Sequence, residues 1–113
     1  MEMTVTELAG HVTRVGLVGR LDAPGAERIS ERFKAAVVGK GRNAILDLSR
    51  VGFVASMGIR LLISTARTLQ QKGCLLVMFG ANEMVQSVFE DAALDQIIPI
   101  VDTEADAIDR LTS

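Results

Sequence analysis

The stretch that most constrains this chain is residues 45–64, ILDLSRVGFVASMGIRLLIS, in which the spacing of the apolar residues changes. Ile45, Leu46 and Leu48 lie between two glycine-containing segments, and they predict a core strand of about five residues. From Ser56 onward the apolar residues recur at three- and four-residue steps, which predicts an amphipathic helix. Its buried face comprises Ile59, Leu62, Ile63, Ala66 and Leu69. We therefore expect a buried strand that leads through a short polar turn into a helix.

Ser56 precedes the first residue of this helical pattern, and a hydroxyl at that position has two interpretations. Such an oxygen often accepts a hydrogen bond from the free backbone N–H groups of the first turn, and an N-cap of this kind contributes about 1 kcal/mol. The same helix N-terminus carries a partial positive charge, so a phosphate attached to Ser56 would be tolerated there. Phosphorylation would add about −1.5 to −2 charges to an exposed surface without unfolding the domain. The two interpretations are compatible.

The N-terminal part of the chain predicts a hairpin followed by a helix. Residues 3–8 and 11–19 have the composition of two short strands. Asp22 then stands where a helix cap is expected, because Pro24 is well accepted in a first helical turn. Glycines at 39 and 41 end this helix before the central strand.

The C-terminal part predicts two more strands and two more helices. Residues 74–79, CLLVMF, form the continuous apolar run of a strand covered on both faces. Residues 97–101 form a short strand whose Pro99 favours an edge position. Asn82 and Thr103 are suited to cap the helices that precede and follow that last strand. The fold class is therefore α/β, with the order β-β-α-β-α-β-α-β-α and a mixed sheet of about five strands covered by helices.

Length, charge and composition exclude several classes of protein. The 113 residues suffice for a single domain, which we expect to span residues 1–113. The net charge of −2 provides no basic footprint, which argues against nucleic acid as a partner. No apolar run approaches the ~20 residues of a membrane span, so we expect no membrane insertion. The absence of a signal-peptide pattern and the presence of a single cysteine predict a cytoplasmic protein.

The residues give little support to catalysis, a metal or a cofactor. His11 is the only histidine and has no second ligand at a metal-binding spacing. Cys74 is interpreted as a core residue, because no base is spaced to activate it as a nucleophile. A Ser56–His11 dyad is conceivable but lacks a supporting motif, and there is no glycine-rich phosphate loop. We therefore predict that the chain is not an enzyme and needs no cofactor.

The block DLSRVGFVASMGIRLL resembles the signature of the STAS domain family, to which the single-domain anti-sigma factor antagonists of bacteria belong. The family pattern is Asp-Leu-Ser, a short apolar segment, then Asp-Ser, a small residue, Gly, and Leu or Ile. The matching residues here are Asp47, Leu48, Ser49, Val51, Phe53, Ser56, Gly58 and Ile59. Two positions depart from the pattern, since Ala55 replaces the usual Asp and Met57 replaces a small residue.

The resemblance implies a phosphorylation switch with Ser56 as the phosphorylated residue. The unphosphorylated protein would bind a kinase-type anti-sigma factor, a GHKL-type ATPase, and so release the sigma factor. Phosphorylation of Ser56 would end that binding, and a PPM-type serine phosphatase would restore it. The residues expected to contact partners are Asp22, Ser56, Met57, Gly58, Arg60 and Arg67.

Two other roles remain open on the same residues. A STAS subunit of an ABC-type lipid transport complex would make a stable structural contact in which Ser56 is not modified, and Ala55 favours this role. Alternatively, the same switch would control a target other than a sigma factor.

Overall fold

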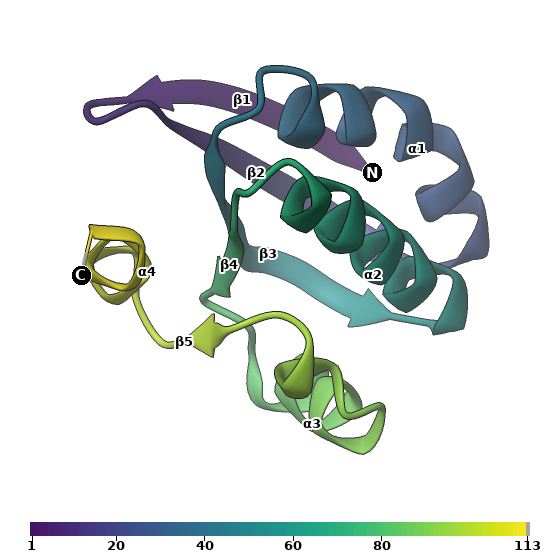
Figure 1. Ribbon diagram of the computed structural model, residues 1–113. Helices are drawn as coiled ribbons and strands as arrows, with labels where there is room; N and C mark the ends of the chain where they lie inside the picture. Colours follow the sequence, from purple (N-terminus) through teal and green to yellow (C-terminus); the bar gives the residue numbers. More distant parts are fainter. Residues whose placement is uncertain (113) are drawn as a thin grey trace.

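The computed structural model describes residues 1–112 as one five-stranded sheet with helices on both faces (Figure 1). The sheet has the order β1-β2-β3-β4-β5, in which β1 and β2 are antiparallel and the other neighbours are parallel. The predicted α/β class, mixed sheet and order of elements are therefore confirmed. The elements are β1 (Glu2–Leu8), β2 (Val12–Leu21), α1 (Ala23–Val38), β3 (Asn43–Val54), α2 (Ser56–Gln71), β4 (Leu76–Phe79), α3 (Glu83–Asp91), the 3-10 helix η1 (Leu94–Gln96), β5 (Ile100–Val101) and α4 (Glu104–Thr112).

Two hydrophobic clusters lie on opposite faces of the sheet, because successive side chains of a strand point to opposite faces. Leu46 belongs to the larger cluster, which α1, α2 and α3 cover with side chains such as Phe33, Leu62 and Phe89. Ile45 belongs to the smaller cluster, which α4 covers; its buried members are Val12, Ile45, Val77, Phe79 and Ala107. All four residues of β4 are buried, as expected of a strand covered on both faces.

The central strand is longer than the sequence predicts. β3 runs from Asn43 to Val54, so the turn expected after Ser49 is wrong. The strand continues because β2 stays paired with it as far as Leu21, through two register shifts beside Gly16 and Gly19. The pairing with β4 ends at Asp47, so the last seven residues of β3 extend beyond β4.

The two C-terminal strands are shorter than expected. β4 begins at Leu76, and Cys74 lies before it in a half-buried position, packed against the edge of the larger cluster. Its Sγ lies 3.1 Å from the carbonyl oxygen of Gly41. Of residues 97–101 only Ile100 and Val101 form a strand, and that strand is an edge, as Pro99 predicts.

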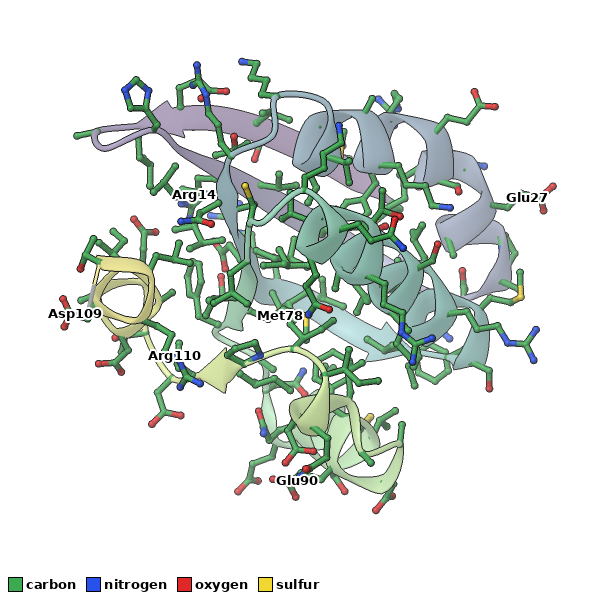
Figure 2. The ribbon with its side chains drawn as sticks, in the orientation of Figure 1. Arg14, Glu27, Met78, Glu90, Asp109 and Arg110 are labelled. Atoms are coloured by element: carbon green, nitrogen blue, oxygen red, sulfur yellow. The ribbon has the colours of Figure 1, made fainter. Side chains whose placement is uncertain are left out.

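An ionic cluster joins α4 to the sheet. Arg14 of β2 donates to Asp47 of β3 at 2.7 Å and to Glu104 of α4 at 2.8 Å. Figure 2 shows Arg14 on the side of the sheet that faces α4. Burial alone would raise the pKa of Asp47, but hydrogen bonds from Ser49 and Arg14 outweigh it and hold that pKa below its ordinary value. Asp47, the first residue of the Asp-Leu-Ser motif, therefore has a structural role.

The helices within residues 1–112 are either too short or too polar to cross a membrane.

Candidate functional site

The starts of α1 and α2 lie together at one edge of the sheet. β2 and β3 are parallel, so their carboxyl ends meet at the same edge, and each strand leads directly into a helix. The backbone N–H of Ala55 donates to the carbonyl oxygen of Leu21 at 3.0 Å, which joins the two strand ends. Asp22 follows Leu21 in the sequence, and Ser56 follows Ala55. The two polar residues selected from the sequence are therefore brought together.

Ser56 is the first residue of α2, and its hydroxyl does not cap the helix. The N-cap is Ala55, whose side chain can accept no hydrogen bond, while its carbonyl oxygen accepts from the N–H of Ile59 at 3.1 Å. The interpretation of Ser56 as the N-cap is therefore wrong, because the helix begins one residue earlier than the apolar pattern indicates. Ser56 is exposed, and its hydroxyl makes no hydrogen bond within residues 1–112. That hydroxyl points into solvent at the positive end of a helix.

Gly58 sets how closely α2 approaches the end of β2. It is buried, and a Cβ added there would lie 2.5 Å from the carbonyl oxygen and 2.6 Å from Cγ of Leu21. A side chain at this position would push the first turn of α2 away from the strand. Gly58 therefore positions Ser56 and offers no exposed surface of its own.

Asp22 is the N-cap of α1, as the sequence predicts. Its Oδ1 accepts from the N–H of Gly25 at 2.9 Å, and its Oδ2 lies 3.4 Å from Nε of Arg20. The hydrogen bond from Gly25 is the main reason that the pKa of Asp22 lies below its ordinary value. The Arg20 guanidinium in turn rests over the ring of Phe53, 4.3 Å from its centre.

Arg20 and Phe53 were not selected from the sequence, although they stand beside the site. They face each other because the second register shift pairs Arg20 with Phe53. The only sequence signal was the position of Arg20 two residues before Asp22. The pairing itself requires the register of the two strands.

A groove of about 330 Å³ runs from the start of α2 along its contact with α1. α2 contributes Met57, Arg60, Leu61 and Ser64, and α1 contributes Ala26, Glu27, Ser30 and Lys34. Met57 is 44% exposed and is one of three exposed large hydrophobic residues among residues 1–112. Arg67 is exposed but does not line the groove, since it lies seven residues, about 10 Å, beyond Arg60 along the helix. The site therefore joins Met57 and Arg60 to Ser56 and leaves Arg67 farther away.

The structure separates His11 from Ser56. His11 is exposed in the turn before β2, whereas Ser56 lies beyond the opposite end of that ten-residue strand. At about 3.3 Å per residue, the strand places the two side chains roughly 30 Å apart, which excludes a dyad. Within the described residues, the His, Cys, Asp and Glu side chains form no cluster that could hold a metal ion.

The geometry defines an α/β domain that presents an exposed serine at a sheet edge. The sequence pattern of the STAS domain matches residues 3–107, and the chain belongs to the STAS domain family. The STAS anti-sigma factor antagonists are regulatory proteins and not enzymes, in agreement with the sequence prediction.

Several relatives can be compared along most of their length. The anti-sigma-B factor antagonist of Listeria monocytogenes serovar 1/2a is 28% identical over 90 residues, which cover 80% of this chain and 79% of the relative. An anti-sigma factor antagonist STAS domain protein from Planctomyces limnophilus has a TM-score of 0.89 at 24% identity, with 98% of each chain covered. The Bacillus cell fate determinant SpoIIAA in its phosphorylated form has a TM-score of 0.70 at 22% identity, with 96% of this chain and 98% of that chain covered. At these identities the two structural likenesses are evidence for the fold.

Proposed function

We propose that this protein is an anti-sigma factor antagonist that acts by partner switching, with Ser56 as the phosphorylated residue. In its unphosphorylated form it binds a serine kinase of the GHKL ATPase type that also serves as the anti-sigma factor. Transfer of the γ-phosphoryl group of ATP to the Ser56 hydroxyl leaves ADP and ends the binding. A PPM-type phosphatase hydrolyses the phosphoserine and restores it.

The observation that carries this proposal is the free hydroxyl of Ser56. It is exposed, takes no part in capping α2, and lies at a helix end that tolerates negative charge. A phosphate there would not need to break a hydrogen bond or move a buried group. The names of the relatives support the same function, since the Listeria protein is an anti-sigma-B factor antagonist.

The magnitudes are sufficient for a switch that needs no refolding. Weakening a complex from micromolar to millimolar takes about 4 kcal/mol. A misplaced like charge at an interface costs several kcal/mol, and a phosphate adds close to two such charges. Met57 and Arg60 lie beside the serine along the groove, so a partner that contacts them would meet the phosphate directly.

The test is a pull-down from the native cytoplasm with wild type, Ser56→Ala and Ser56→Asp as parallel baits, read by mass spectrometry. Wild type and Ser56→Ala should capture a serine kinase of this type, and Ser56→Asp should lose it. Ser87→Asp is the matched control, because Ser87 is an equally exposed serine on α3. The control should capture as much kinase as wild type.

Two outcomes would replace the proposal. Capture of ABC transporter subunits by all four baits would indicate a structural subunit of a lipid transport complex, a role that Ala55 favours. A second result would be capture of a kinase in the expected pattern, together with an effector enzyme, where that kinase does not regulate a sigma factor. This result would indicate the same switch acting on another target.

A further inference from the structure

The charges of this protein are divided unevenly along its sequence. Residues 83–113 carry eight acidic residues and one arginine, a net charge of −7. Residues 1–82 carry eleven basic and six acidic residues, a net charge of +5. The overall charge of −2 is therefore the sum of a strongly basic and a strongly acidic part of the chain, and we call this distribution bipolar.

The acidic end is built by α3, the segment around β5, and α4. Figure 2 shows Glu90 on α3 and Asp109 on α4, both directed away from the sheet. α1 and α2 lie across the sheet from α4 and beside one another above α3, which packs on the same face of the sheet (Figure 1). The groove beside Ser56 therefore belongs to the basic end.

The charged residues of the helix that bears Ser56 are all basic. α2 contains Arg60 and Arg67 and no acidic residue, and both arginines are exposed. Across the groove, α1 contributes Lys34 and Glu27. Lys34, Arg60 and Arg67 form no ion pair within residues 1–112, so their charges are not neutralised internally.

We propose that the partner bound at this groove presents an acidic segment with one apolar side chain, which enters the hollow beside Met57. The proposal rests on partner switching as the function and specifies the chemistry of the partner. The carboxylates of the segment face Arg60 and Lys34 in the groove, with Arg67 farther along α2, and the apolar side chain contacts Met57, Leu61 and Ala26. Two effects then contribute to the binding free energy: salt-dependent attraction between charges, and burial of the apolar side chain.

The same charges explain how a phosphate could reverse the binding. The groove residues Lys34, Arg60 and Glu27 together carry a net charge of +1. A phosphate on Ser56 adds about −1.5 to −2 and makes the local sign negative. An acidic segment that was attracted before phosphorylation is then repelled after it.

The bipolar distribution also affects the rate of association. A partner with an acidic docking face attracts the α1–α2 side and repels the α3–α4 side, so the molecule arrives in the productive orientation. Steering of this kind raises association rates by about 10- to 1,000-fold and is lost as salt is added.

The experiment measures the association rate with the purified kinase that the wild-type bait recovers, at salt concentrations from about 25 to 500 mM. The association rate should fall at least about tenfold over that range. Arg60→Glu should lower it about tenfold at low salt. Arg50→Glu makes the same charge change at an exposed, unpaired arginine on the other face of the sheet, and it should lower the rate less than about threefold.

The apolar contact is tested separately through the dissociation rate. Met57→Ala should raise that rate at least about fivefold at every salt concentration, because it removes apolar contact and no charge. Met84→Ala, at a 62% exposed methionine on α3, is the matched control and should leave the rate unchanged. The proposal of an acidic segment would be overturned if the association rate were independent of salt, or if Arg60→Glu and Arg50→Glu had equal effects. Either result would leave partner switching intact. Failure of the wild-type bait to capture any kinase would overturn both.

Discussion

Replacing Gly58 with alanine tests whether the close approach of α2 to β2 holds the functional serine in place. The added Cβ would lie 2.5 Å from the carbonyl oxygen of Leu21. That oxygen is part of the backbone and already accepts the hydrogen bond from Ala55. Because this backbone oxygen cannot rotate away, the first turn of α2 must move outward.

The expected cost follows from two opposing effects. Alanine is about 1 kcal/mol better than glycine in a helix interior, which favours the variant. Overpacking at a rigid contact costs about 1–3 kcal/mol, and weakening the Ala55–Leu21 hydrogen bond costs about another 1 kcal/mol. The net loss of unfolding free energy is then about 1–3 kcal/mol. For a domain of this size, a loss of 2 kcal/mol lowers Tm by roughly 6–12 °C.

The measurement is urea denaturation of Gly58→Ala alongside Gly52→Ala. Gly52 lies in the exposed part of β3, and a Cβ added there meets no atom within 4 Å. The Gly52 variant should be as stable as wild type or slightly more stable, because alanine reduces the entropy of the unfolded chain. Amide exchange should also show faster exchange at Ala55 in the Gly58 variant alone. If both variants unfold at the same urea concentration, the argument that Gly58 is needed for close approach is refuted.

Three further substitutions test the structural roles assigned to polar residues. Asp22→Ala should lower the unfolding free energy by about 1 kcal/mol, because Gly25 loses its cap, whereas Asp22→Asn should restore most of it; equal losses would contradict the cap. Ser56→Ala should change stability by less than about 0.5 kcal/mol in urea denaturation, since the hydroxyl makes no bond; a loss near 1 kcal/mol would show a hidden cap. Asp47→Asn should cost about 1.5–3 kcal/mol at pH 7, because the Arg14 charge loses one of its two carboxylate partners. The pKa of Asp47 is lowered in the folded state, so its stabilisation is present above the ordinary value of 3.8 and disappears as the pH falls through the folded pKa. In urea titrations the difference between wild type and the Asn variant should therefore be complete above the ordinary pKa of 3.8 and should shrink as the pH falls below it, and a constant difference down to pH 2 would contradict this role.

Much of the fold could be predicted because the local signals agree with the tertiary structure. Leu62, Ala66 and Leu69 of the predicted helical face are buried against the sheet, whereas Ile59 and Ile63 are half-buried, and Leu61 and Thr65 are buried although the pattern did not include them. Asp22 and Asn82 cap the helices that follow them, as predicted. These signals depend on residues close together in the sequence. The hydrogen bonds that they predict, such as that from Val85 to Asn82, form within three residues.

The errors occurred where partners distant in the sequence decide the outcome. Residues 50–54 resemble a turn because of Gly52, but pairing with β2 keeps them extended. The start of α2 was placed one residue late because a serine is a better cap than an alanine, and here the Ala55–Leu21 hydrogen bond fixes the boundary. The groove beside Met57 could not be found from sequence, since it exists only where α1 and α2 pack together.

The unequal lengths of β3 and β4 determine how Ser56 can be reached. β3 continues for seven residues after β4 has ended, and β1 stays paired with β2 only as far as Val18, opposite Arg50. The serine therefore stands just past the tip of an extension whose last part, residues 51–54, is paired with β2 alone. Asn82, before α3, supports the base of that extension through its side-chain amide, 3.4 Å from the carbonyl oxygen of Val51. An enzyme with a deep active-site cleft can therefore enclose the tip without displacing the rest of the domain. Under the proposed function, the kinase and the phosphatase would each reach Ser56 at this exposed edge of the sheet.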